Sequence, residues 1–244
     1  APVGRWRLAG EGRGRQRSVA LPMGPGARRV VDIRSAGNRS LRDTVAGEGF
    51  VEVETPMLQN QAGGAAARPF STHMNALDME LFLRIAPELY LKRCVVGGID
   101  RVFEINRNFR NECVDSSHSP EFAMLECYQP YTVYNVIGEL TRRLIQHAAV
   151  AATGSTMVAL ADGTELDLGG EWPQITLYGA ISQALGEEIT VQTSMDDLTA
   201  IAERLEIPVA PHSGPGQLAE EFFDEVVTEA VVAPTCVRDF QAAE

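Results

Sequence analysis

Long apolar runs, paired cysteines and clustered histidines are all missing from this 244-residue chain. No apolar run approaches the roughly 18 residues that a membrane-spanning helix requires, and no apolar signal core opens the chain. The four cysteines show no Cys-x-x-Cys spacing and the four histidines are scattered, which argues against a zinc site or a disulfide framework. The sequence therefore predicts a protein of the reducing cytoplasm, without a membrane segment and without a recognisable metal-ligand pattern.

Lysine is also scarce, and negative charge is concentrated at one end. Lys92 is the only lysine against twenty arginines, a bias that we attribute to a GC-rich genome. The net charge is -12, yet residues 1–34 hold eight arginines against two acidic residues. Residues 151–244 hold two arginines against seventeen acidic residues. Because such a region does not attract a polyanion through its long-range field, any contact with nucleic acid is expected elsewhere.

Two regions differ in their patterning. Residues 1–30 are rich in Gly, Arg and Pro without a sustained period, so we expect them to be disordered or poorly ordered, with an RNA-binding arm as the alternative. Residues 31–244 mix short strands with helices without a strict βαβ rhythm. This mixture predicts an α+β domain with an antiparallel sheet flanked by helices.

Hydrophobic periodicity and Gly/Pro signals place the elements of this domain. Helices are predicted at 31–48, 87–96, 132–152, 176–185, 195–205 and 216–231. Strands are predicted at 50–54, 81–85, 101–112, 121–131 and 231–237. The helix at 132–152 is amphipathic, and its apolar face is formed by Val136, Ile137, Leu140, Leu144 and Ile145.

A strand–loop–strand segment from Phe103 to Tyr128 carries the most chemistry. Arg110 offers a planar fork of donors for a phosphate or carboxylate, and Glu112 would face the same way on a continuous strand. His118, in the polar loop that follows, could reach a terminal phosphate. The alternatives are an exposed Arg110–Glu112 ion pair of ~0 to 1 kcal/mol and a solvated loop histidine.

The second strand of this segment presents an aromatic ring and a carboxylate on one face. Phe122 could stack on a base or serve as a core residue, and Glu126 and Tyr128 share its strand face. A buried carboxylate needs a partner, which a substrate ammonium would supply. Without a ligand, Arg84 or Lys92 could pair with Glu126 instead.

Glu88 adds a second carboxylate, at the start of the helix predicted at 87–96 and behind Gly63-Gly64. It could bind an α-amino group, although acidic residues in a first helical turn are common for reasons of the helix dipole alone. Taken together, these side chains suit an anionic, aromatic, amine-bearing ligand. ATP together with an amino acid fits that description.

Four segments carry a family resemblance. Residues 49–58 resemble motif 1 of class II lysyl-tRNA synthetases, residues 63–70 and 83–89 resemble their amino-acid loops, and residues 103–128 resemble motif 2. The resemblance implies a class II aminoacyl-tRNA synthetase-like catalytic domain over 31–244, with motif 1 at about 31–56 and motif 2 at about 101–131. It further implies ATP-dependent activation of lysine to lysyl-adenylate and transfer to tRNA(Lys) in translation.

The resemblance also implies a role for each site residue. Arg110 would be the catalytic residue, because it would hold both the α-phosphate and the lysine carboxylate. The implied ATP-binding residues are Arg110, Glu112, His118 and Phe122. The implied lysine-binding residues are Gly64, Glu88, Arg110, Glu126 and Tyr128.

The chain departs from the family pattern in several places. The family's motif 3, its acidic magnesium-binding segment and its anticodon-reading OB-fold find no match, and Cys113 replaces a glycine at the motif 2 turn. We therefore expect a C-terminally truncated catalytic domain, with magnesium implied by the family but without its usual ligands. Weak binding of tRNA(Lys) and a homodimer formed through motif 1 are also expected. The alternatives are a non-catalytic paralogue or gene remnant, and a lysyl transferase acting on a protein or lipid.

Overall fold

The computed structural model describes residues 25–112, 118–160, 163–210, 213–228 and 230–240. They belong to two compact units, Ala1–Gly154 and Ser155–Glu244, which are called unit 1 and unit 2 below. The expectation of disorder for residues 1–30 falls largely outside the described residues. Among the helices of the described part, none has the length and apolar character that crossing a membrane requires.

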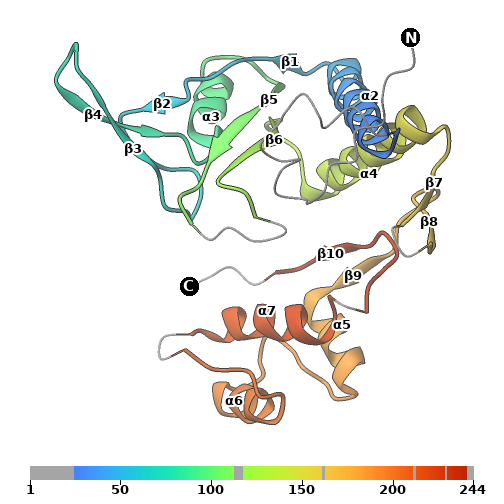
Figure 1. The fold of residues 1–244 in the computed structure, drawn as a ribbon. Coiled ribbons are helices and arrows are strands. Elements are labelled where there is room, and N and C mark those ends of the chain that lie inside the picture. Colours follow the sequence, from blue (N-terminus) through green and yellow to red (C-terminus); the bar gives the residue numbers. More distant parts are fainter. Residues whose placement is uncertain (1–24, 113–117, 161–162, 211–212, 229, 241–244) are drawn as a thin grey trace, which may run out of the picture. The chain divides into compact units, whose positions relative to one another are not determined.

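The described part of unit 1 combines two small sheets with three helices (Figure 1). In chain order its elements are α2 (Pro25–Gly47), β1 (Val51–Glu52), β2 (Leu58–Gln59), β3 (Ser71–Met74), β4 (Met79–Leu83), α3 (Glu88–Val96), β5 (Val102–Phe109), β6 (Glu121–Tyr128) and α4 (Tyr134–Thr153). One sheet has the order β1-β5-β6 and the other β2-β4-β3. The described elements are thus α+β, as the sequence predicts.

Helix α2 is longer than the sequence pattern suggests. It begins at Pro25 rather than at residue 31, and it continues through Gly37 to Gly47. Proline suits the first position of a helix because its fixed φ is already helical and its missing N–H has no intrahelical partner there. Residues 25–30, part of the segment expected to be disordered or poorly ordered, therefore lie in the first turns of α2.

The β5–β6 pair is antiparallel, as expected, and its register runs from Val102↔Tyr128 to Phe109↔Glu121. Strand β1, in contrast, is parallel to β5. This parallel pairing is possible because β2–β4 and α3 form a long crossover that returns the chain in the same direction. The predicted strands 101–112 and 121–131 are shortened at Phe109 and Tyr128.

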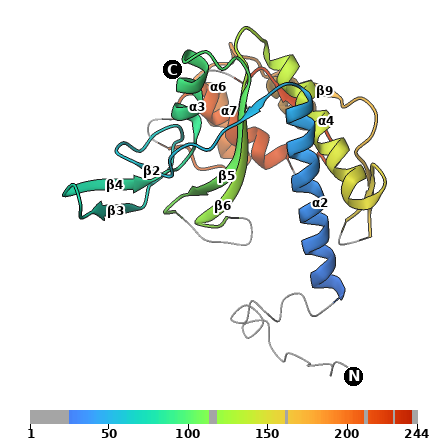
Figure 2. The same cartoon turned by 90° about the horizontal axis from the view of Figure 1, so that it is seen from above.

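The core of unit 1 lies between the β5–β6 pair and two helices. Figures 1 and 2 both show α2 and α4 side by side. The cluster comprises Leu41, Val45, Phe50, Phe103, Ile105, Leu125, Cys127, Leu140 and Leu144. Leu140 and Leu144 of α4 are buried as predicted, but Val136 and Ile145 are exposed. The apolar stripe of α4 is therefore narrower than its sequence suggests, because only one side of the helix is covered.

Unit 2 contains β7 (Met157–Ala159), β8 (Glu165–Asp167), β9 (Gln174–Thr176), α5 (Leu177–Leu185), α6 (Met195–Arg204), α7 (Pro215–Val226) and β10 (Cys236–Arg238). The predicted helices are present, but α7 ends at Val226 rather than at residue 231. Thr176 and Ser194 cap α5 and α6 by accepting hydrogen bonds from backbone N–H groups. A separate core forms around Leu177, Ile181 and Phe222. The strand expected at 231–237 begins only at Cys236 and is parallel to β9.

Candidate functional site on the polar face of the β5–β6 pair

The β5–β6 pair has one polar face, opposite the face that packs against α2 and α4. Side chains alternate along a strand, so Glu104 and Asn108 of β5 point away from Phe103 and Ile105. The register places Glu104 opposite Glu126 and Asn108 opposite Phe122. Helix α3 contacts both strands. Three of the sequence-predicted site residues, Phe122, Glu126 and Tyr128, therefore do share one face.

Arg110 lies just beyond the end of β5. Its backbone N–H donates to the Pro120 carbonyl (2.9 Å), and its Nε donates to the Ile85 carbonyl (3.4 Å). The guanidinium carbon lies 5.2 Å from the centre of the Phe122 ring, within the range of a cation–π contact. The two residues expected to hold the α-phosphate and the adenine are thus direct neighbours.

Glu112 does not continue the strand with Arg110, and that expectation is wrong. β5 ends at Phe109 because the chain turns to the 63–70 loop, where the Asn111 N–H donates to the Arg68 carbonyl (2.7 Å). The Glu112 carboxylate accepts a hydrogen bond from the Arg68 N–H (3.2 Å). Glu112 is therefore positioned by a backbone contact between two loops.

His118 lies exposed, three residues before the first residue of β6. The residues that precede it, 113–117, lie outside the described part of the chain, and they include Cys113, which replaces the family's glycine at the motif 2 turn. The predicted contact between His118 and a terminal phosphate stays a prediction.

Glu126 and Tyr128 are directly linked. The Tyr128 hydroxyl donates a hydrogen bond of 2.8 Å to the Glu126 carboxylate. Burial raises the pKa of Glu126 above its ordinary value, while the hydrogen bond from Tyr128 acts in the opposite direction. Burial and the neighbouring Glu126 raise the pKa of Tyr128, which keeps its hydroxyl protonated. The pair thus offers a carboxylate and a neutral phenol oxygen, a combination that suits an ammonium group.

Glu88 begins α3 close to the loop that carries Gly64. Gly64 has φ +89°, and a Cβ added there would lie 3.0 Å from the Glu88 Cβ, so glycine permits both this backbone shape and this close approach. The Glu88 carboxylate binds the Lys92 ammonium at 2.6 Å. Lys92 Nζ also lies 5.8 Å from the centre of the Tyr128 ring. A cation therefore already lies where the resemblance places the ligand's α-amino group.

A buried polar cluster beside this site was not predicted. Arg84 and Glu104 are 0% and 1% exposed and form an ion pair of 2.8 Å. The Thr55 hydroxyl donates to Glu104 (2.6 Å) and accepts from Arg84 (2.9 Å). The expectation that Arg84 or Lys92 would pair with Glu126 is wrong, because each binds another carboxylate. Two charges within the apolar runs 81–86 and 102–105 were the available sequence signal.

Asn108 is a further buried polar residue on the same face. Its side chain is fully buried, and among the described residues neither its amide nitrogen nor its amide oxygen has a hydrogen-bond partner. Buried polar groups are ordinarily paired, so an unsatisfied amide at this position is unusual. Asn108 lies directly opposite Phe122.

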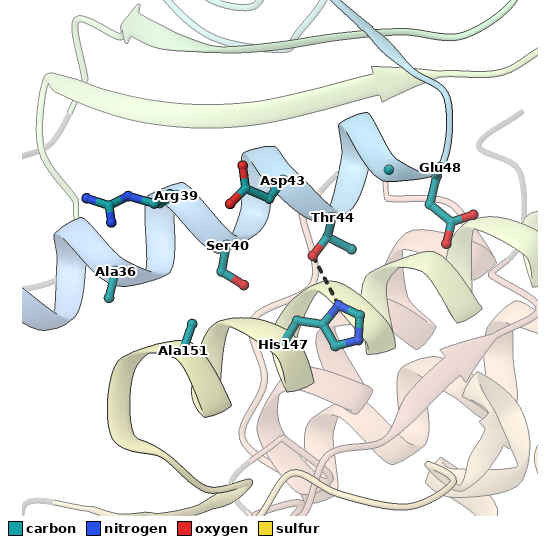
Figure 3. A pocket seen from close by; sticks show the side chains of 9 residues that line it. Ala36, Arg39, Ser40, Asp43, Thr44, Glu48, His147 and Ala151 are labelled. Atoms are coloured by element: carbon teal, nitrogen blue, oxygen red, sulfur yellow. Dashed lines mark hydrogen bonds between the residues drawn. The ribbon is translucent and has the colours of Figure 1, made fainter.

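A second hollow lies between α2 and α4, apart from the polar face (Figure 3). It is a cleft of about 580 Å³ lined by Ala36, Arg39, Ser40, Asp43, Thr44, Gly47, Glu48, His147 and Ala151. Thr44 and His147 are joined across it by a hydrogen bond of 3.1 Å. Its side chains are partly paired with one another, and none was predicted as a site residue.

The part of the chain that the structure describes contains no evident set of ligands for magnesium. No group of three or more His, Cys, Asp and Glu side chains there is arranged to hold a metal ion. The carboxylates of the polar face are engaged in hydrogen bonds or ion pairs with Tyr128, Lys92 and Arg84. The described residues therefore do not fit a resident metal ion.

Comparison with known proteins defines the class. A family model described as tRNA synthetases class II (D, K and N) matches residues 10–241. The chain therefore belongs to the class II tRNA synthetase family.

Its relatives point to the lysine branch of this family. It is 57% identical to a lysine–tRNA ligase of Kineococcus radiotolerans and 56% identical to one of Mycolicibacterium gilvum, in each case over 98% of this chain and 48% of the relative. It is also 47% identical, over 94% of this chain and 21% of the relative, to the lysylphosphatidylglycerol biosynthesis bifunctional protein LysX of Gordonia bronchialis. The chain spans about half the length of the curated lysine–tRNA ligases that it matches.

Proposed function

We propose that the polar face of the β5–β6 pair binds lysine and ATP as part of a lysine–tRNA ligase. This enzyme would convert lysine and ATP to lysyl-adenylate and then transfer the lysyl group to tRNA(Lys) in translation. The observation that carries the proposal is the Tyr128–Glu126 hydrogen bond on the same strand face as Phe122. The identity of 56–57% to lysine–tRNA ligases supports it.

The two amino groups of lysine are assigned to four residues. Glu126 and Tyr128 would bind the ε-ammonium, since the carboxylate supplies charge and the phenol oxygen supplies a second acceptor. Glu88 would bind the α-amino group, with Gly64 keeping the loop close to it. Because Glu88 holds Lys92 in the structure, the ligand's amino group would share or displace that cation.

The ATP end of the site is assigned to the residues around the end of β5. Phe122 would stack on the adenine, Glu112 would accept from the adenine amine and His118 would meet the γ-phosphate. Arg110 lies over Phe122, so its guanidinium must move from the ring for the adenine to stack there. These assignments rest on the family resemblance and on the closeness of Arg110 to Phe122.

Arg110 is also the proposed catalytic residue. In the activation step a lysine carboxylate oxygen attacks the α-phosphorus of ATP, and the bond from that phosphorus to the pyrophosphate oxygen breaks. Negative charge builds on the α-phosphate oxygens, and the guanidinium would stabilise it. Family members in general use ATP and magnesium, but no step is assigned to a metal ion among the described residues.

The partners and the location are proposed on the same basis. The acceptor would be tRNA(Lys), bound weakly by this chain because residues 151–244 carry a large net negative charge. A homodimer would form through the motif 1 region, residues 31–56, within a domain over 31–244. We place the protein in the cytoplasm, as expected for a translation enzyme.

Calorimetric titration of the 244-residue chain with lysine tests the site. We expect binding to wild type, about tenfold or greater loss on Glu126→Gln, and no binding of norleucine, which lacks the ε-ammonium. Absence of lysine binding by wild type, or equal binding of norleucine, would contradict the proposal. Lysine-dependent ATP–pyrophosphate exchange then separates an active ligase from the non-catalytic alternative.

The relative named for lysylphosphatidylglycerol biosynthesis supports a second candidate, transfer of lysine to a lipid. The activation chemistry would be the same, and only the acceptor would differ. Incubation of the chain with ATP, radiolabelled lysine and either phosphatidylglycerol vesicles or tRNA separates the two. Label recovered in the lipid extract would favour this candidate, and label recovered only in tRNA would exclude it.

A further inference from the structure

We propose that Arg84 is a positioning residue for Glu126. By binding Glu104, the carboxylate directly across the strand pair, it leaves Glu126 as the negative charge that receives the ligand's ammonium group. This inference rests on the proposed function and deepens it, because it says what sets the charge of the lysine-binding carboxylate.

The geometry begins with the cross-strand register. Glu104 of β5 lies directly opposite Glu126 of β6. Side chains that face each other in this way have Cβ atoms about 4.5–5.5 Å apart. Two negative charges that face each other across a strand pair repel each other, and Glu104 is almost fully buried. A cation bound to Glu104 offsets this repulsion at Glu126.

Arg84 is that cation, and its place is tightly determined. Its Nη1 binds Glu104 (2.8 Å) and the Thr55 hydroxyl (2.9 Å), and its Nε donates to the Arg107 carbonyl (2.8 Å). Glu104 also accepts from Asn106 Nδ2 (3.2 Å). The guanidinium thus joins β5 to the segment that follows β1, and it neutralises Glu104 without binding Glu126.

The charges that face Glu126 come from four segments. Tyr128 is on β6 itself, Glu104 is on β5, Arg84 follows β4, and Glu88 and Lys92 are on α3. Lys92 is bound to Glu88. Burial has the largest effect on the pKa of Glu126 and raises it, and Glu88 and Glu104 raise it further. Tyr128 and Arg84 lower it, so Arg84 is the cation that favours the ionised form.

One atom of Arg84 indicates that this residue does more than hold two segments together. Its Nη2 is buried and has no hydrogen-bond partner in the described part of the chain. A buried donor left unpaired costs roughly 1–3 kcal/mol. A pair of apolar side chains would fill the space without that cost. A charged residue at this position is explained if the Arg84 guanidinium acts on a neighbour such as Glu126.

Carboxyl NMR of the chain labelled with ¹³C at glutamate side chains measures the Glu126 titration directly, without any ligand. The signal is identified by its loss in Glu126→Gln. Glu104→Gln keeps the shape of the buried pair and removes its negative charge, so the Glu126 pKa should fall by about one unit. Arg84→Met should raise it by a similar amount, and the double variant Arg84→Met/Glu104→Gln should return it close to wild type.

Exposed Glu121, on the same strand, supplies the matched control, and Glu121→Gln should leave the Glu126 titration unchanged. An unchanged Glu126 titration in Glu104→Gln overturns the inference, even if Arg84→Met fails to fold. A double variant that shifts as far as Arg84→Met overturns it too, because a merely structural role predicts no rescue. Lysine calorimetry tests the proposed function and not this inference. If the wild-type chain does not bind lysine, the proposed function is contradicted, and the titration result remains valid.

Discussion

The two faces of the β5–β6 pair do opposite things. On one face Phe103, Ile105 and Leu125 pack against α2 and α4 and exclude water. On the other face Glu104 and Glu126 are brought together across the strands at a free-energy cost. One alternating pattern thus produces both the stability of unit 1 and its candidate chemistry.

The two faces are also stabilised differently. Burial of apolar side chains contributes roughly 25 cal/mol per Å² and has no directional requirement. The two charges of the buried Arg84–Glu104 pair lose their hydration on folding. Only well-placed ion-pair and hydrogen-bond partners offset that loss, so the pair adds little net stability. Removing one member of that pair destabilises the protein far more than replacing both members with apolar side chains would, because the remaining buried charge then has no partner.

The largest effect is expected on the apolar face. Phe103 is fully buried, so Phe103→Ala should lower the free energy of unfolding by about 3–5 kcal/mol. Urea unfolding followed by circular dichroism measures this change. Val51→Ala, at an exposed position of β1, is the control and should change it by less than about 0.5 kcal/mol. Equal losses for both variants would contradict the assignment of this face as the core.

Next in size is a change at the polar end of the sheet. Arg110→Ala should weaken ATP binding by about 10- to 150-fold, since a charge-assisted hydrogen bond contributes about 1.5–3 kcal/mol. Isothermal titration calorimetry measures the affinity. The control is Arg107→Ala, which removes an exposed arginine bound to Glu121. Unchanged ATP affinity in Arg110→Ala would refute its assigned role.

A smaller effect should follow from loss of the Tyr128–Glu126 hydrogen bond. Tyr128→Phe keeps the ring and removes the donor, so lysine affinity at neutral pH should fall by about 2- to 10-fold. The hydrogen bond lowers the pKa of Glu126, so the variant's Glu126 should titrate at higher pH. Lysine affinity measured across pH tests both points. An unaltered profile would show that the phenol does not act on the carboxylate.

The smallest effect concerns stability on the polar face. The pKa of Glu126 is raised in the folded state, so folding favours the protonated form. Wild type therefore loses stability as the pH rises from the ordinary value of 4.5 through the raised folded value. Glu126→Gln should raise Tm at pH 7 by about one or two degrees, and this gain should vanish below pH 4.5. A gain at pH 4 as large as at pH 7 would contradict the charge-based cause.

Much of the secondary structure was predictable because it depends on local signals. Pro87 and Gly97 bracket α3 as expected, and the antiparallel β5–β6 pair was foreseen. The parallel pairing of β1 was not, because strand direction depends on the crossover and not on the strand's own residues. Exposure of Val136 and Ile145 was likewise missed, since periodicity does not say how wide a face the rest of the protein covers.

The amino-acid sequence by itself determined the family and the residue types of the site: Arg110, Phe122, Glu126 and Tyr128 stand in a pattern that local spacing shows. Only the tertiary structure decided which charges meet. It paired Arg84 with Glu104 and Lys92 with Glu88, and it separated Glu112 from the strand. The physical reason is that ion pairing and burial depend on segments far apart in sequence, whereas strand alternation depends on neighbours alone.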